Sequence, residues 1–236
     1  MEWVKRTKLL FGDEVIQKFY RSHVLVVGLG GVGAYAAEQI VRAGIGKLTI
    51  VDADTVEPSN INRQMPALHS TLGQFKAQIM KQRLTDINPD LQLTVLNQFL
   101  VEESIPQVLK EPYNYVIDAI DTLSPKVQLI RYSLERQIPI VSSMGSGGKT
   151  DPTQVSIVDI SKTYNCMLAR KVRKRLSKFN IRKGVTAVFS PEEISKEMVV
   201  LEEGRYKASN VGTISYMPAV FGCFCASVVI NDLRKD

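Results

Sequence analysis

Charged side chains of both signs stand near the ends of predicted strands, in a combination that suits chemistry at a triphosphate. Asp52 and Asp121 each close an apolar run, and Arg63 and Lys76 lie between them. An arginine binds phosphate oxygens as a fork, whereas a lysine acts as a point charge. A carboxylate such as Asp121 can hold the Mg²⁺ that accompanies ATP. The residues therefore predict a site that binds ATP and cleaves it.

A glycine-rich turn precedes these residues and predicts where the phosphates bind. Gly28, Gly30 and Gly33 fit the spacing G-x-G-x-x-G, between an apolar run and a helical pattern. Glycines let the backbone turn tightly and approach a phosphate, whose negative charge is favoured at the amino end of a helix. Asp52 closes the next strand and is placed to accept hydrogen bonds from a ribose. A nicotinamide dehydrogenase shares these features, so the turn alone indicates a nucleotide without identifying it.

Strands and helices that alternate along the chain would place these residues at one edge of a sheet. Apolar runs predict the strands, and apolar residues at helical spacing predict the helices between them. The expected strands cover residues 23–28, 47–52, 91–99, 113–121 and 138–145. The expected helices cover residues 31–43, 74–87 and 125–137. The pattern predicts an α/β fold, a Rossmann-like doubly wound and largely parallel sheet with extra C-terminal strands and helices.

The rest of the chain adds elements around this unit, and we expect residues 1–236 to form a single domain. An amphipathic helix is expected over residues 7–19, with Leu9 and Leu10 among its apolar contacts. Residues 190–210 have mixed charge and are expected to form a mobile surface excursion. Two further strands are expected over residues 153–160 and 184–190.

The composition indicates a cytoplasmic protein with a full hydrophobic core. The chain of 236 residues is 44% hydrophobic. Its charged N-terminal segment lacks the apolar stretch of a secretory signal, and its three cysteines include no CxxC pair that would suggest zinc. Residues 208–231 carry no charge, but a helix starting near Pro218 would be about 22 Å long, shorter than the roughly 30 Å hydrocarbon layer. We therefore expect a buried helix and no membrane partner.

Positive charge is concentrated in residues 162–183, which hold nine basic residues and no acidic one. The whole chain has 30 basic and 24 acidic residues, so the chain would be mildly acidic without this segment. Helical spacing predicts that one face packs and the other presents basic side chains. A solvated face usually carries acidic residues too, so we favour contact with a nucleic-acid phosphate backbone. The residues expected to make it are Arg170, Lys171, Arg173, Lys174, Arg175 and Lys178.

Five motifs in this order resemble the ubiquitin-activating-enzyme-like adenylyltransferases, which include the activators of the thiamin and molybdopterin sulfur carriers. The motifs are GLGGVG, VDAD, NINRQ, GQFKAQ and DAID. The resemblance implies a single adenylating domain that uses ATP and Mg²⁺ to convert a carboxylate into an acyl-adenylate, and that acts as a homodimer.

The same resemblance assigns roles to individual residues. Asn60 and Arg63 would bind phosphates, Lys76 the reacting phosphates, and Asp121 the magnesium ion. Arg6 would reach across a dimer interface into the active site of the partner. The residues expected to line the nucleotide are Gly28, Gly30, Gly31, Gly33, Asp52, Asp54, Asn60, Arg63 and Lys76.

A closer resemblance is to the tRNA threonylcarbamoyladenosine dehydratase branch of these adenylyltransferases. It is carried by RTKLLFG, SNINRQMPAL, YVIDAIDTLSPKVQLI, SSMGSGGKTDPTQ and ISKTYNCMLARKVRKRLSK. The two CxxC zinc pairs that are usual in sulfur-carrier activators are missing. The branch uses ATP to cyclise a modified adenosine that bears a threonine carboxylate in the tRNA anticodon loop. The resemblance thus implies tRNA as substrate. The glycine-rich loop after the strand over residues 138–145 lies where open α/β sheets bind ligands, so we expect Ser143, Gly145 and Lys149 near the substrate carboxylate; an ordinary turn is the alternative.

Other functions fit parts of the sequence. An activator of the C-terminus of a ubiquitin-like sulfur-carrier protein would use the same nucleotide site but would leave the basic segment without a role. A nicotinamide-dependent dehydrogenase would not need Arg63 or Lys76, and a non-catalytic tRNA-binding module would not need Asp121. Cys166 could carry a thioester or persulfide, or be an ordinary thiol. Whether a sulfur-transfer or electron-transfer protein is a further partner stays open.

Overall fold

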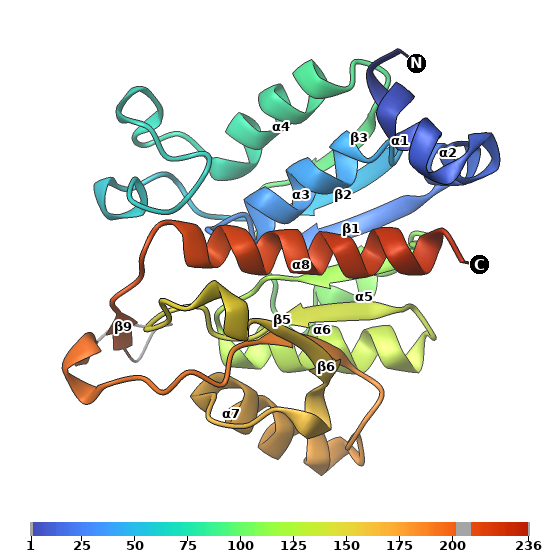
Figure 1. Cartoon of the computed structure of the whole chain (residues 1–236). Coiled ribbons are helices and arrows are strands. Elements are labelled where there is room, and N and C mark those ends of the chain that lie inside the picture. Colours follow the sequence, from blue (N-terminus) through green and yellow to red (C-terminus); the bar gives the residue numbers. More distant parts are fainter. Residues whose placement is uncertain (1, 202–208, 236) are drawn as a thin grey trace.

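A seven-stranded sheet forms the centre of the protein and confirms the predicted α/β fold (Figure 1). The computed structural model describes residues 2–201 and 209–235. The strand order is β3-β2-β1-β4-β5-β7-β6, and every neighbouring pair is parallel except β6 and β7. The strands are β1 (His23–Val27), β2 (Lys47–Val51), β3 (Gln92–Leu96), β4 (Tyr115–Asp118), β5 (Ile140–Ser143), β6 (Ser156–Asp159) and β7 (Thr186–Phe189).

Helices cover both faces of the sheet. Successive strand residues point to opposite faces, and in the central strands the side chains on both faces are apolar. Val24 and Val26 of β1 belong to one apolar cluster, and Leu25 and Val27 belong to the other. The first cluster includes residues of α3 (Gly33–Arg42), α4 (Lys76–Ile87) and α8 (Tyr216–Leu233). The second includes residues of α5 (Ile105–Val108), α6 (Leu123–Glu135) and α7 (Met167–Leu176). The central strands are therefore buried on both sides.

The carboxyl ends of the parallel strands meet at one edge of the sheet. The chain order reverses between β1 and β4, which lie side by side in the sheet. Open α/β sheets bind ligands at such a switch point. The loops after β1, β2, β4 and β5 all start from this edge, so the fold brings together the turns that carry the predicted site residues.

The N-terminal segment is not the single helix predicted over residues 7–19. It forms α1 (Lys5–Phe11) and α2 (Asp13–Arg21). Gly12 lies between them with a φ of 86°. A positive φ is incompatible with an α-helix and favours glycine, so the chain breaks at this residue.

These two helices lie at the amino ends of β1 and β2, away from the edge that carries the loops (Figure 1). Gly46 N, before β2, donates a hydrogen bond of 3.1 Å to the carbonyl of Phe19 in α2. Leu9 and Leu10 of α1 are 81% and 73% exposed. The prediction that these leucines make apolar contacts is therefore wrong within one chain.

The C-terminal helix α8 begins at Tyr216, two residues before the predicted start, with Pro218 in its first turn. By length and composition, its 18 residues are the one candidate membrane span in the described part of the chain. Half of this stretch is buried inside the fold. A Cβ at Gly222 would lie 2.4 Å from the Val32 carbonyl, so the glycine allows α8 to pack closely on α3.

The segment of residues 190–210, expected to be a mobile excursion, contains regular structure. β8 (Val199–Leu201) pairs with β9 (Ser209–Val211) in an antiparallel arrangement. Residues 202–208 lie outside the described residues. Short 3-10 helices cover Glu2–Val4, Pro58–Asn60, His69–Thr71, Pro152–Gln154, Ile160–Lys162, Ser177–Phe179 and Lys196–Met198.

Candidate functional site

The turn between β1 and α3, called here the glycine turn, contains Gly28, Gly30 and Gly33. Close packing leaves no room for a side chain at Gly28 or Gly33, but it does leave room at Gly30. A Cβ at Gly28 would lie 2.8 Å from the carbonyl oxygen of Ala119, and a Cβ at Gly33 only 1.7 Å from the carbonyl oxygen of Gly28. A Cβ at Gly30 would meet its nearest atom, in the side chain of Gln64, at 3.8 Å. Packing thus explains the first two glycines, whereas Gly30 leaves its surface open to a ligand.

Gly31 also lies in close contact with the protein. Its Cβ would come within 2.8 Å of Pro218 at the start of α8. The glycine turn is therefore held between the loop after β4 and the first turn of the C-terminal helix.

The carboxylate of Asp52 joins the loops that follow β1 and β2. One oxygen accepts a hydrogen bond of 2.5 Å from Leu29 N and the other accepts one of 2.7 Å from Asp54 N. Burial raises the pKa of Asp52, although the two backbone donors and the charge of Lys76 act in the opposite direction. The side chain that was predicted to bind a ribose therefore also fixes the glycine turn against the neighbouring loop.

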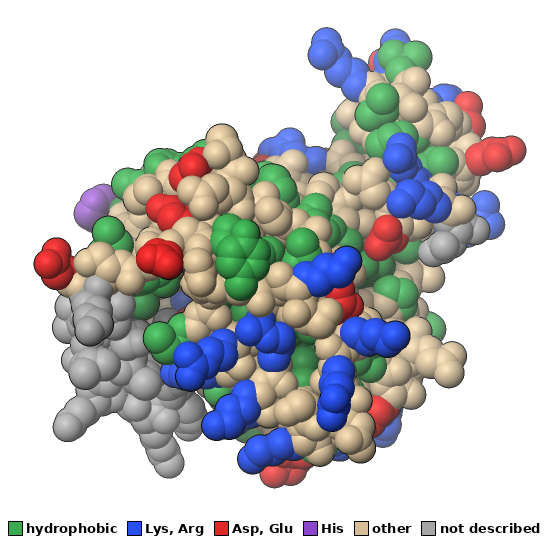
Figure 2. Space-filling view, turned by 60° about the horizontal axis from the view of Figure 1, so that its bottom comes forward, with side chains coloured by type: hydrophobic (Ala, Val, Ile, Leu, Met, Phe, Trp, Pro, Cys, Tyr) green, Lys and Arg blue, Asp and Glu red, His purple; other side chains and the backbone are tan. Residues whose placement is uncertain are grey.

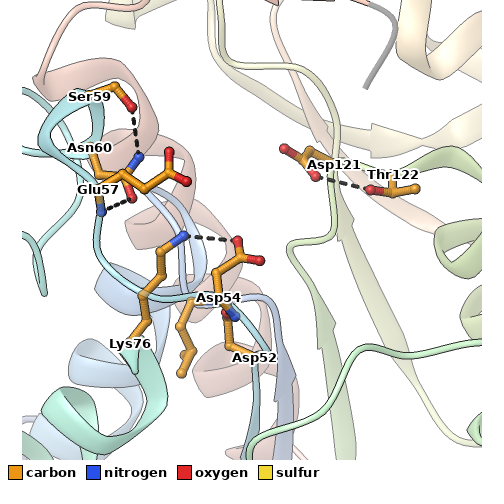
Figure 3. Close-up of polar contacts among 9 residues, drawn as sticks. Asp52, Asp54, Glu57, Ser59, Asn60, Lys76, Asp121 and Thr122 are labelled. Atoms are coloured by element: carbon orange, nitrogen blue, oxygen red, sulfur yellow. Dashed lines mark hydrogen bonds and ion pairs between the residues drawn. The ribbon is translucent and has the colours of Figure 1, made fainter. Parts of the chain in front are cut away.

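Lys76 is a buried cation at the start of α4. Its ammonium lies 2.9 Å from a carboxylate oxygen of Asp54 (Figure 3). Its backbone N–H donates a hydrogen bond of 3.0 Å to the Asp54 carbonyl. The side chain of Lys76 is 5% exposed, whereas that of Asp54 is 66% exposed. The partner of this ammonium thus faces solvent, so an anion entering the site can compete for the same charge.

The loop after β2 adds amide and guanidinium groups. Asn60 is buried, and its side-chain oxygen accepts a hydrogen bond of 3.2 Å from Glu57 N. Arg63 uses one terminal nitrogen to donate to the Ser59 carbonyl and to the Asn62 side chain, both at 2.8 Å. The two residues are therefore carried by one tight turn whose bonds set their direction.

Gln64 is a residue of this loop that the sequence did not single out. Its side-chain oxygen is buried and accepts no hydrogen bond from the described residues. The same side chain is the nearest neighbour of Gly30. Its position in the NINRQ motif was the available signal, but only the structure places it over the glycine turn.

Asp121 enters from the loop after β4. It is exposed and lies across from Asp54, Lys76 and Asn60 (Figure 3). Thr122 donates a hydrogen bond of 3.4 Å to its carboxylate. Asp118, at the end of β4, instead forms a fully buried ion pair of 2.8 Å with Lys126, which sequence reasoning treated only as a helix residue.

The loop after β5 reaches the same edge, but its lysine is engaged within the protein. Lys149 is buried and donates a hydrogen bond to the Glu192 carbonyl, and burial lowers its pKa. Ser143 is buried and donates to the Met144 carbonyl at 3.1 Å. Gly145 lies beside Leu168 of α7, with 3.9 Å between its ideal Cβ and the leucine Cβ. The loop therefore connects this edge of the sheet to the basic segment.

Basic side chains gather on the face of the molecule that carries α7 (Figure 2). Two of the predicted residues make contacts within the protein: Arg173 donates to the Thr163 carbonyl at 2.8 Å, and Arg175 donates to the Ser124 hydroxyl at 2.6 Å. The exposed predicted residues are Arg170, Lys171, Lys174, Arg175 and Lys178. Cys166, which precedes the helix, is buried.

Arg6 is the predicted site residue that stands apart from the others. It is exposed on α1, at the amino ends of the strands, whereas the other predicted nucleotide residues lie at the carboxyl ends. Within one chain the structure does not bring Arg6 to the glycine turn.

Comparisons with known proteins agree along nearly the whole chain. The family model described as "ThiF family" matches residues 4–235. The tRNA threonylcarbamoyladenosine dehydratase of Bacillus subtilis (strain 168) is 40% identical over 242 residues, covering 98% of this chain and 94% of the relative. The crystal structure of the Escherichia coli tRNA N6-threonylcarbamoyladenosine dehydratase in complex with ATP has a TM-score of 0.91 and 36% identity, covering 99% of this chain and 94% of that chain.

A second kind of relative matches a shorter part of the chain. The molybdopterin-synthase adenylyltransferase of Escherichia coli (strain K12) is 33% identical over 146 residues, which is 62% of this chain and 58% of the relative. The dehydratases therefore match a longer part of this chain than the molybdopterin-synthase adenylyltransferase does.

The glycine turn predicts two different outcomes for the same substitution. Gly33→Ala should lower the free energy of unfolding by about 2 kcal/mol or more, because its Cβ overlaps the Gly28 carbonyl. Gly30→Ala should change the free energy of unfolding by no more than about 0.5 kcal/mol, because its Cβ meets only a side chain at ordinary contact distance. Urea unfolding of both variants measures the difference, and equal losses of stability would contradict this division of roles.

Proposed function

Because the chain belongs to the ThiF family, we propose that it catalyses the ATP-dependent dehydration of N6-threonylcarbamoyladenosine in tRNA. Family membership confirms the resemblance expected from the motifs. The observation that carries the proposal is the match of the dehydratases to 96% or more of this chain, against 62% for a molybdopterin-synthase adenylyltransferase. The alternative, activation of a sulfur-carrier protein, is therefore not favoured.

ATP would bind at the carboxyl edge of the sheet, with its phosphates over the glycine turn. The open surface of Gly30 supports this placement, because the fold does not itself require a glycine there. Asp52 would accept hydrogen bonds from the ribose. Asn60, Arg63 and Lys76 would contact the phosphates, since they supply the donors and positive charges around the turn.

The reaction begins with a carboxylate, which is a poor electrophile. A carboxylate oxygen attacks the α-phosphorus of ATP, the bond to the β-phosphate breaks, and pyrophosphate leaves. The carbamoyl group on the same side chain then attacks the acyl carbon, loses a proton and releases AMP, so the nucleoside loses the elements of water. Internal attack can have an effective molarity of roughly 10⁵ to 10⁸ M, so no protein nucleophile is required.

The chain's own residues contribute mainly charge stabilisation to this sequence. Lys76 and Arg63 would stabilise negative charge that moves onto the departing phosphates, and a buried cation such as that of Lys76 is effective in this role. Cys166 needs no part in the reaction.

Asp121 would bind Mg²⁺ together with phosphate oxygens. Its exposed carboxylate is a hard oxygen ligand of the kind that Mg²⁺ prefers, and such sites commonly use one or two carboxylates with substrate phosphates. Among residues 2–201 and 209–235, no cluster of three or more His, Cys, Asp or Glu could hold a metal by itself. A magnesium ion completed by ATP fits this donor set, and it would screen the charge of the departing pyrophosphate.

A homodimer would complete the site with Arg6. The exposed Leu9 and Leu10 support this proposal, because they place apolar surface on the same short helix as Arg6. That helix lies at the far end of the sheet from its own nucleotide residues, so its arginine is available to a partner.

The basic face around α7 would bind the tRNA backbone. Exposed Lys171, Lys174 and Lys178 carry charge toward solvent, and the helix adjoins the loop after β5, where the acceptor carboxylate would lie. Ser143, Gly145 and Lys149 remain our candidates for that loop's role. Arg173 would instead hold α7 in place, because its guanidinium donates a hydrogen bond to the Thr163 carbonyl. The reaction would take place in the cytoplasm, where tRNA and ATP are available.

The dehydration is tested by incubating the protein with ATP, Mg²⁺ and tRNA that contains threonylcarbamoyladenosine, then weighing the nucleosides after digestion. We expect the nucleoside to lose the mass of one water in the presence of ATP only. Lys76→Ala should slow the loss by about 100-fold, because a phosphate-stabilising charge is removed. An unchanged nucleoside with the unsubstituted protein would overturn the proposed function.

The shared active site predicts complementation between two inactive variants. A mixed dimer of Arg6→Ala and Lys76→Ala chains contains one site with both residues intact. Random exchange of subunits should therefore restore about a quarter of the original activity. A mixture that stays as inactive as its components would contradict the placement of Arg6 in the partner's site.

The basic face predicts a salt-dependent affinity for tRNA. Replacing Lys171, Lys174 and Lys178 by Gln should weaken binding and reduce the slope of log affinity against log salt by about 0.7 to 0.9 per lysine that contacts a phosphate. Fluorescence titrations with labelled tRNA at several salt concentrations measure both quantities.

The matched control replaces three exposed lysines on other elements by Gln: Lys81, Lys110 and Lys235. This control should keep the slope of the unsubstituted protein, and ATP affinity should stay constant in both variants. Equal effects of the two substitutions would show that the tRNA does not use the α7 face.

A further inference from the structure

The ion pair between Asp118 and Lys126 is the most deeply buried charged contact described near the candidate site. Both side chains are fully buried, and the ammonium lies 2.8 Å from the carboxylate. Removing two charges from water is costly, and their attraction compensates only when further hydrogen bonds complete the geometry. Such a pair is a weak source of stability, so its position in the fold needs another explanation.

Further hydrogen bonds connect this pair to the loop after β4. Lys126 also donates to the carbonyl of Ile120 at 2.9 Å, while Ile120 N donates to the Asp118 carboxylate at 3.1 Å. Ser142 of β5 donates to the same carboxylate at 2.6 Å. Both backbone polar groups of Ile120 are therefore held by the pair, and the pair is in turn held by the neighbouring strand.

The loop held in this way forms part of the candidate site at two points. Asp121 follows Ile120 directly in the chain. The carbonyl of Ala119 lies 2.8 Å from the ideal Cβ position of Gly28, so the same loop packs against the glycine turn. A shift of Ile120 would consequently move the backbone from which the Asp121 carboxylate projects.

We propose that Lys126 is a positioning residue, which acts through the Ile120 carbonyl to set the direction of the Asp121 carboxylate. This inference rests on the proposed function, because it takes Asp121 to be the magnesium ligand. Lys126 itself reaches neither nucleotide nor metal, since its ammonium is enclosed by Asp118 and Ile120.

The environment of the pair supports a fixed arrangement of charge. Cys225 of α8 lies within electrostatic range of both members, and burial raises the pKa of its thiol to about 12. The thiol thus stays neutral at physiological pH and adds no competing negative charge. Ser142 supplies a neutral donor, so the carboxylate of Asp118 is satisfied without losing its pairing with Lys126.

The test replaces the pair by apolar residues of similar size, in the double variant Asp118→Leu with Lys126→Met. Removing both charges together avoids leaving one of them buried alone. We expect cooperative unfolding and unchanged affinity for AMP without magnesium, measured by calorimetry. The Mg²⁺ concentration for half-maximal dehydration should rise about tenfold or more, because the ligand is no longer aimed at the phosphates.

A double-mutant cycle with Asp121→Asn separates positioning from general disturbance. If Lys126 acts through Asp121, Asp121→Asn should have a much smaller effect on turnover in the apolar-pair variant than in the unsubstituted protein. Glu38→Gln is the matched control, because Glu38 is a buried acid paired with Arg42 and Arg83 on the α3–α4 side of the sheet. It should alter stability while leaving the magnesium dependence unchanged.

Ser142→Ala provides a second variant if the apolar pair does not fold. It removes one hydrogen bond to Asp118 and should raise the magnesium requirement in the same direction, by a smaller factor. If the apolar-pair variant folds and is active but keeps the magnesium dependence of the unsubstituted protein, the positioning role of Lys126 is overturned and the proposed function is not affected. Absence of ATP-dependent dehydration by the unsubstituted protein would instead overturn the proposed function.

Discussion

The candidate site depends on two hydrogen bonds to the carboxylate of Asp52. One holds the turn after β1 and the other holds the loop after β2, so a single buried side chain sets the distance between them. Neither loop could keep this arrangement by local preference, because one is rich in glycine and the other is irregular. Burial makes the charged form of the carboxylate costly, and the two backbone donors act against that cost. The position of Lys76 follows from the same loop, since its backbone bonds to Asp54.

The same principle recurs at the next loop, where another buried acid holds the backbone. Asp118 and Lys126 hold the main chain of Ile120, and the loop packs against Gly28. Two buried acids, Asp52 and Asp118, thus hold the loops around the site through hydrogen bonds to protein groups. The more exposed Asp54 and Asp121 face the space between the loops. Such an arrangement fixes the groups around an anion before it binds, which is how preorganised charge lowers a reaction barrier.

Much of this could be predicted from the sequence, because periodicity and glycine spacing are local signals. The alternation of strands and helices gave the parallel sheet, and its topology brought Asp52, Lys76 and Asp121 to one edge. Gly12 was the available signal for the break in the N-terminal helix, but the apolar spacing on both sides of it favoured one helix. The exposure of Leu9 could not be predicted, since apolar spacing does not show what covers a helix face. The role of Lys126 depends on contacts between residues of β4, β5 and α6. The spacing of residue types within one segment of the sequence does not predict such contacts. For the same reason, the sequence did not show that Lys149 and Arg173 are held by neighbouring backbone groups.

The proposed function requires that a substrate carboxylate becomes joined to AMP before water is lost. Labelling both oxygens of that carboxylate with heavy oxygen, and following the label by mass spectrometry during a single turnover, tests this step. Adenylation predicts that AMP acquires one labelled oxygen in its phosphate while pyrophosphate stays unlabelled. Label in inorganic phosphate, or AMP that carries no label, would contradict adenylation of the substrate carboxylate.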